Sequence, residues 1–116
     1  MSTPTYPTYA IPVATTPHLP GYEQSTVRHV GPVFGVIARS MGFARGLTGG
    51  LRSIKKGEVP EFTATVEEAR HAAVERLVEH AQALGANAVV SMRFDSTEMG
   101  EGLAEIVAYG TAVVIS

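Results

Sequence analysis

Histidines and carboxylates are the side chains in this chain whose types and spacing suit metal chemistry. Glu67, His71 and Glu75 recur at intervals of four, which places three potential ligands on one face of a predicted helix. A zinc site needs three or four ligands that converge, and one face of a single helix does not surround an ion. We therefore interpret this row as a solvated helix surface and expect metal binding by an isolated subunit to be weak.

A second group of carboxylates, Asp95, Glu98 and Glu101, lies in a predicted glycine-bearing loop. Carboxylate oxygens suit a hard divalent cation such as calcium or magnesium, but this loop lacks the regular spacing of a calcium-binding loop. A polar hairpin connection is the favoured interpretation. Convergence of Glu98 or Glu105 from several copies of the chain stays open as an alternative.

Basic residues are concentrated in the glycine-rich segment 39–57. Its backbone amides, together with Arg45, Arg52 or Lys56, could hold a phosphate group. The segment contains neither a phosphate-binding loop pattern nor a dinucleotide fingerprint. Apolar residues at near-helical spacing favour a short, weak helix over residues 40–54, and an anion or nucleotide site is the alternative.

Composition limits the remaining classes of function. The 116 residues are 45% hydrophobic, which fits one domain, and the net charge of −2 implies no general attraction to nucleic acid. The lack of cysteine excludes disulfides, thiolate metal sites and cysteine nucleophiles. No nucleophile-elbow motif is present, so we expect a protein that is not an enzyme. Without a signal-peptide pattern or a membrane-length apolar run, we expect a cytoplasmic protein that does not contact membranes.

The element that organises the domain is a predicted helix over residues 65–84. Thr65 and Glu68 form a capping-box pattern at its start, and alanine-rich apolar positions recur at steps of three and four. Gly85 follows the last of them, where a left-handed residue is expected to end the helix. The period then changes to two, which predicts a strand over residues 88–94 with Ala88, Val90, Met92 and Phe94 on one face. The members of the helical stripe are Val66, Ala69, Ala73, Leu77, Ala81 and Leu84.

The remaining segments are extended. The prolines of residues 1–12 predict a disordered N-terminal extension, with a partner-docking peptide as the alternative, and residues 13–116 then form one domain. A short strand is expected at residues 13–16. Residues 23–38 read as a strand in which Gly31 and Pro32 indicate a bulge or an edge position.

The last predicted strand, residues 103–115, has two apolar faces. Its even-numbered positions, which include Gly110, are mostly small and suit close contact with the alanine-rich helix. Ala73 of the helix is expected at or near the same contact. The odd-numbered positions of the strand are mostly large, and one long helix does not cover both faces. A second copy of the chain is the simplest cover, so a homo-oligomer is expected, with Val107, Tyr109 and Val113 as interface candidates.

The sequence resembles the YbjQ-like family of small bacterial proteins, which is labelled heavy-metal-binding without an established metal role. The likeness is carried by residues 15–16, 19–21, 31–35, 69–84, 85–95 and 108–114, including Gly-Ala-Asn-Ala at 85–88 and Tyr-Gly-Thr-Ala-Val at 109–113. The resemblance implies a small α+β domain of dodecin-like type, an antiparallel or mixed sheet packed on one long helix, and a homopentameric ring. It supplies no catalytic residues. The expected function is a homo-oligomeric scaffold or ligand-binding protein. The alternatives are a divalent-metal protein with sites between subunits, for which the weak candidate ligands are His71, Glu67, Glu75, Asp95 and Glu98, and an anion or nucleotide binder.

Overall fold

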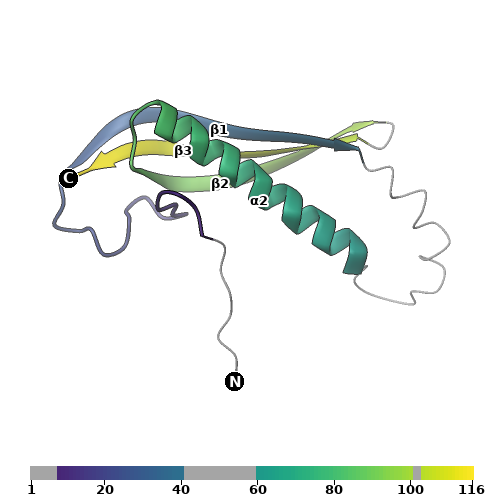
Figure 1. Ribbon diagram of the computed structural model, residues 1–116, viewed down its shortest axis with the longest axis horizontal. Helices are drawn as coiled ribbons and strands as arrows, with labels where there is room; N and C mark the ends of the chain where they lie inside the picture. Colours follow the sequence, from purple (N-terminus) through teal and green to yellow (C-terminus); the bar gives the residue numbers. More distant parts are fainter. Residues whose placement is uncertain (1–7, 41–59, 101–102) are drawn as a thin grey trace, which may run out of the picture.

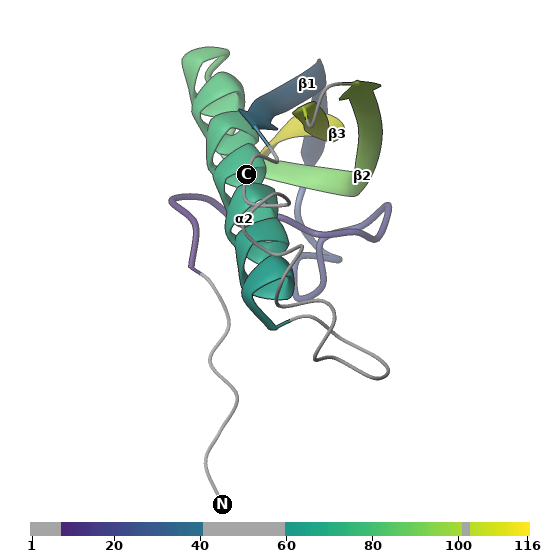
Figure 2. The same cartoon turned by 90° about the vertical axis from the view of Figure 1, so that its right-hand side faces the viewer.

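The computed structural model describes residues 8–40, 60–100 and 103–116. Three strands, β1 (Val27–Ser40), β2 (Ala88–Gly100) and β3 (Leu103–Ile115), form an antiparallel sheet in the order β1-β3-β2. One helix, α2 (Pro60–Ala83), lies across the sheet (Figure 1). This arrangement confirms the small α+β fold with one long helix. Seen from the end, α2 covers one side of the sheet, and no described helix covers the other (Figure 2).

Helix α2 ends where the sequence predicts and begins earlier. Gly85 has φ +84°, its N–H donates to the carbonyl of Gln82, and the N–H of Ala86 donates to the carbonyl of Ala81. These two bonds form a Schellman motif, which satisfies the last carbonyls of the helix. The predicted N-cap at Thr65 is wrong, because the helix starts at Pro60, a residue whose fixed φ favours the first helical position.

The main core lies between α2 and the sheet. Alternation along β1 turns Val33, Gly35 and Ile37 toward the helix, and all three are buried. A β-carbon at Gly35 would collide with the backbone of Ala73 and Leu77, so the helix crosses β1 at a position that requires glycine. The predicted helix-sheet contact of Ala73 is therefore confirmed. The other fully or nearly fully buried core residues include Ala69, Val74, Ala81, Val89, Ala108 and Ala112.

Strand β2 departs from the predicted alternation. The register shifts between Val90 and Arg93, and Ser91 has a positive φ of 54°, so a β-bulge interrupts the strand. Ala88 and Val90 consequently pack on the side away from α2, whereas Met92 and Phe94 face α2. The prediction that all four share a face is wrong. A β-carbon at Gly110 would meet Val89, Val90 and Met92 of β2. The lack of a side chain at Gly110 therefore lets β2 come close and leaves room for its bulge.

Both edges of the sheet are partly capped. The N–H of Phe34 on β1 donates to Nδ1 of His80 at 3.1 Å, and the carbonyl of Val36 accepts from Arg76 at 2.9 Å. Pro32 lies in β1, which is an edge strand, so its predicted edge position is confirmed. Proline is tolerated there because it has no backbone N–H to donate. Along the edge of β2, Val13 pairs with Val89 in a parallel bridge, so the predicted short strand at 13–16 is a single bridge with flanking hydrogen bonds.

Two predicted segments lie wholly or partly outside the described residues. The weak helix expected over residues 40–54 is not described beyond Ser40, and the N-terminal extension is not described up to residue 7. Within residues 8–12, Tyr9 and Ile11 pack against the main core, and the carbonyl of Pro12 accepts from the N–H of Val89.

Candidate functional site

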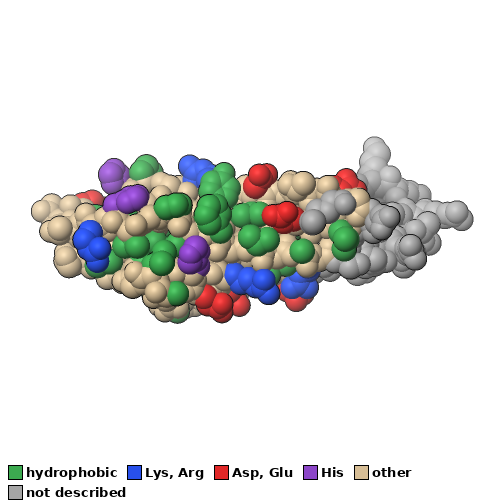
Figure 3. Space-filling view, turned by 90° about the horizontal axis from the view of Figure 1, so that it is seen from above, with side chains coloured by type: hydrophobic (Ala, Val, Ile, Leu, Met, Phe, Trp, Pro, Cys, Tyr) green, Lys and Arg blue, Asp and Glu red, His purple; other side chains and the backbone are tan. Residues whose placement is uncertain are grey.

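The side of the sheet that α2 does not cover carries an exposed apolar patch. Phe34 pairs with Tyr109 and Val36 with Val107, so these four side chains from β1 and β3 are neighbours. Phe34 is 51% exposed, Val36 42% and Tyr109 40%. We call these four residues the open sheet face. Hydrophobic side chains run along the middle of the molecular face in Figure 3, among scattered charged groups.

The same side of the sheet is covered at its other end by the chain itself. Ala88, Val90 and Val113 form a small buried cluster against which Leu19 and Ile115 pack. Val113, an expected interface residue, is only 3% exposed because this cover lies within the subunit. Of the three interface candidates, Val107 and Tyr109 lie on the open sheet face and Val113 does not.

A pocket of about 760 Å³ lies where residues 17–29 meet this end of the sheet. We call it the N-terminal pocket. Its apolar lining includes Leu19, Val90 and Val113, and hydroxyl groups of Ser91 and Thr111 lie among them. Ser91 would face α2 in a regular strand, so the bulge at this residue is what adds its hydroxyl to the pocket.

Histidines and one carboxylate lie at the same pocket. His18 and His29 line it, and both are exposed. Hydrogen bonds from the backbone N–H groups of Glu23 and Gly21, aided by the charge of His18, lower the pKa of the Glu23 carboxyl. The pocket therefore combines an apolar interior with imidazoles, hydroxyls and a carboxylate that favours its ionised form. This site was not predictable from the sequence, because its lining comes from segments far apart in the chain.

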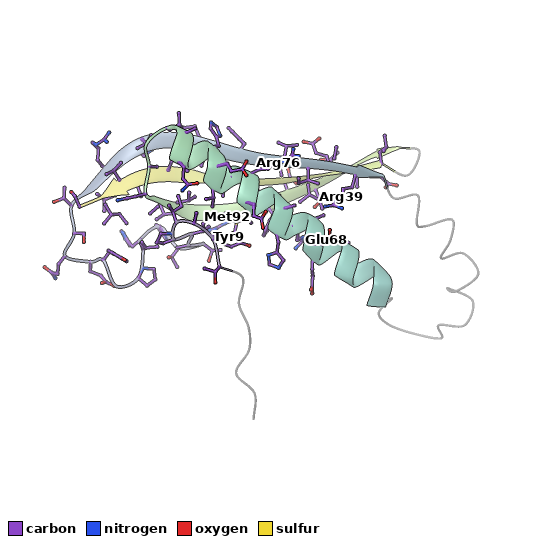
Figure 4. The ribbon with its side chains drawn as sticks, viewed as in Figure 1. Tyr9, Arg39, Glu68, Arg76 and Met92 are labelled. Carbon is purple, nitrogen blue, oxygen red and sulfur yellow. The ribbon has the colours of Figure 1, made fainter. Side chains whose placement is uncertain are left out.

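The predicted ligand row on α2 is present, and its histidine is engaged in another contact. Glu67, His71 and Glu75 line a shallow pocket of about 500 Å³ on the exposed side of the helix. The hydroxyl of Tyr9 lies 2.8 Å from Nδ1 of His71 (Tyr9 is labelled in Figure 4). Burial, and secondarily the negative charge of Glu75, raise the pKa of Tyr9 above its ordinary value. His71 therefore anchors the N-terminal segment to the helix.

The other predicted ligands do not meet. Asp95 and Glu98 belong to β2, which extends to Gly100, so the predicted loop is largely strand and the prediction of a long acidic connection is wrong. Asp95 pairs with Val107 and Glu98 with Ala104, which places their side chains on opposite faces of the sheet. Across residues 8–40, 60–100 and 103–116, no three His, Asp or Glu side chains are grouped to hold a metal ion.

The basic segment 39–57 is described at Arg39 and, for its backbone, at Ser40. Nη2 of Arg39 lies 3.7 Å from Oε1 of Glu68 of the same chain. Both residues are labelled in Figure 4. The charge of Arg39 is thus directed toward its own helix. The anion-site candidates Arg45, Arg52 and Lys56 lie outside the described residues.

The Gly-Ala-Asn-Ala sequence at 85–88 has a structural role that the sequence did not reveal. The side-chain amide of Asn87 donates to the carbonyl of Ile115 and accepts from its N–H, at 2.9 and 2.8 Å. Asn87 thereby ties the turn after α2 to the end of β3. Arg93 similarly donates to the carbonyls of Thr15 and Met92. These polar side chains tie separate segments of the fold together.

Comparison with known proteins agrees with the resemblance seen in the sequence. A family with the description "Putative heavy-metal-binding" (YbjQ) matches residues 11–116. The chain belongs to this family. A UPF0145 protein of Bradyrhizobium sp. (strain ORS 278) is 52% identical over 103 residues, which cover 89% of this chain and 91% of that protein. A UPF0145 protein of Pyrococcus furiosus is 48% identical and covers 89% of each chain.

The relatives extend beyond bacteria. A UPF0145 protein of Methanoregula boonei is 46% identical over 89% of this chain and 84% of that protein. This protein and the Pyrococcus protein are archaeal, so the expectation of a bacterial family is too narrow. The names of these three relatives state no enzymatic activity. Among the described residues, α2 is not apolar enough over a sufficient length to cross a bilayer.

Proposed function

We propose that this protein is a non-enzymatic homo-oligomer whose subunits associate through the open sheet face. The observation that carries the proposal is the adjacent pair Phe34 and Tyr109, each about half exposed on the side that α2 leaves uncovered. Two rings at this exposure leave on the order of 200 Å² of aromatic surface in water, before Val36 and Val107 are added. A second copy that covers this surface stabilises both subunits.

The surroundings of the open sheet face have the pattern of an interface. Arg93 and Asp95 of β2 pair with Tyr109 and Val107, so charged side chains border the apolar centre. An apolar centre with a polar rim is typical of surfaces that bind protein. The family resemblance narrows the expected assembly to a closed ring of five subunits, which requires a head-to-tail contact related by rotation. We propose this ring as the scaffold on which any ligand sites are repeated.

Light scattering at micromolar protein concentration tests the assembly. We expect the mass of an oligomer for the unaltered chain, and dissociation when Tyr109→Glu or Val107→Glu places a charge on the open sheet face. The matched control is Ser96→Glu, which adds the same charge to an exposed residue on the opposite side of β2. A monomeric unaltered chain would remove the proposal. A dimer would keep the interface and remove the ring.

A metal-binding protein with sites between subunits is the second candidate. It is supported by the description of the family and by the alignment of Glu67, His71 and Glu75 along one shallow pocket. Metal analysis of the assembled, tag-free protein tests it. We expect His71→Ala to leave any tight metal stoichiometry unchanged, as should the matched control His80→Ala on the same helix. Loss of stoichiometric metal in His71→Ala alone would favour the metal protein.

An anion or nucleotide site over residues 39–57 is the third candidate, for which we propose one experiment. Thermal unfolding in the presence of phosphate and nucleotides measures ligand affinity for the folded state. No shift in melting temperature is expected. A shift that Arg52→Ala abolishes would establish the site.

A further inference from the structure

We propose that the N-terminal pocket is a binding site for a small aromatic molecule that carries one hydrogen-bonding group. The volume of about 760 Å³ lies within the range of small-molecule sites in proteins, which is roughly 300–1,000 Å³. Such sites are mostly apolar and contain a few polar groups that orient the ligand. The lining comes from a single chain, and the pocket serves as a ligand site only if the proposed assembly leaves it open.

The lining defines the class of ligand. Val90 and Val113 form an aliphatic floor, and Leu19 packs against it from the N-terminal segment. The rings of Tyr22 and His29 are part of the same lining, and aromatic rings pack favourably against the ring of a ligand. A planar, largely apolar molecule therefore fits the floor and the aromatic wall together.

Polar groups define the other end of the ligand. The hydroxyls of Ser91 and Thr111 lie beside the aliphatic floor, since Thr111 pairs with Val90. Each hydroxyl both donates and accepts a hydrogen bond. Glu23, which favours its ionised form, disfavours a second negative charge at the pocket. An uncharged or cationic hydrogen-bonding group, such as an amide, a hydroxyl or an amine, is thus the polar end that this pocket recognises.

The backbone of Ser91 is an independent indication of function. A non-glycine residue with φ 54° is uncommon, and the conformation costs free energy that glycine would avoid. Residues held in such conformations, and β-bulges, both concentrate at functional sites. In this strand the result of the strained bulge is that Ser91 adds a hydroxyl to the pocket, which glycine could not supply.

Fluorescence titration of the full chain with phenylnaphthylamine tests the site. This neutral probe has two aromatic ring systems joined by one N–H, and its emission rises in apolar surroundings. We expect saturable binding of one probe per chain, weakened at least about tenfold by Thr111→Phe, which fills the pocket. The matched control is Thr97→Phe, the same substitution on an exposed position of β2 outside the pocket; it should retain full affinity.

Four results would overturn the proposal. Equal affinity in Thr111→Phe and the unaltered chain would place the probe elsewhere and overturn it, as would the absence of saturable binding. Light scattering on the same samples shows whether Thr111→Phe instead disrupts the assembly, in which case the pocket is a subunit contact and the proposal is wrong. If Thr111→Phe does not fold, Ser25→Trp fills the pocket from the N-terminal segment, and undiminished probe affinity in that variant overturns the proposal.

Discussion

Gly35→Ala is the substitution for which the structure predicts the largest effect from the smallest change. One added methyl group would collide with the carbonyl of Ala73 and the N–H of Leu77. Both are backbone atoms of α2, so no side-chain rotation relieves the collision. The helix must move away from β1, or β1 must bend. Either response separates Val33 and Leu77, which are fully buried at this contact.

The magnitude follows from the packing. Overpacking a well-packed core costs roughly 1–3 kcal/mol. We expect Gly35→Ala to cost an amount near the top of this range, because the atoms it would meet belong to the helix backbone. A loss of about 3 kcal/mol corresponds to a fall in melting temperature of about 10 °C for a domain of this size. Because Gly35 has no positive φ, alanine causes no backbone strain there, and the whole loss is steric.

Equilibrium denaturation at one fixed protein concentration measures the effect, because the proposed assembly would make apparent stability depend on concentration. The double variant Gly35→Ala with Ala73→Gly is the control. Removing the side chain of Ala73 leaves its carbonyl in place. The double variant should therefore regain none of the stability that Gly35→Ala loses. Recovery of stability would show that side chains set the helix-sheet distance. A loss below about 0.5 kcal/mol for Gly35→Ala alone would refute the close crossing itself.

Three further predictions concern other special backbone and side-chain positions. Gly85→Ala should cost about 1 kcal/mol in denaturation experiments because φ is +84° in the helix cap, and a neutral result would contradict the Schellman motif. Ser91→Gly should stabilise the chain by up to about 1 kcal/mol, since glycine relieves the positive φ; destabilisation would show that the side chain of Ser91 is needed for folding. The raised pKa of Tyr9 means that its contact with His71 is strongest below pH 10.0 and is lost as pH rises through the higher folded value. Proteolysis of the N-terminal segment should therefore accelerate above pH 10.0, without such a transition in Tyr9→Phe.

The sequence predicted the parts of the fold that depend on local chemistry. The end of α2 was predictable because a glycine at the end of a helical period has one common use, the left-handed cap. The small face of β3 was predictable because alternation assigns Ala108 and Ala112 to one side, and both are fully buried there. The edge position of β1 followed from Pro32, which removes a backbone donor.

The parts that sequence reasoning missed depend on contacts between distant segments. The residues from Thr65 onward fit the capping-box pattern, but the helix begins earlier, at Pro60. Nothing in the order Val90-Ser91-Met92 indicates a bulge, since serine is unremarkable in a strand. The bulge is explained by Gly110 on the neighbouring strand, because the missing side chain of this glycine leaves space for it. The N-terminal pocket depends on this bulge and on residues 17–29, so it lay beyond local patterns.

A cover that lies within the subunit explains why the open sheet face is small. Apolar composition on both faces of β3 led to the expectation that a second copy covers the entire far side. The structure divides that side instead, because Leu19 and its neighbours cover Val113 within the subunit, whereas Tyr109 stays 40% exposed. Since Tyr109 belongs to the open sheet face and does not line the pocket, whereas Thr111 lines the pocket, the two regions can be altered one at a time. Substitutions at Tyr109 should change the mass of the assembly without changing probe affinity, and Thr111→Phe should do the reverse. If one substitution changed both properties, the two regions would form a single surface, and the separation of assembly from ligand binding would have to be given up.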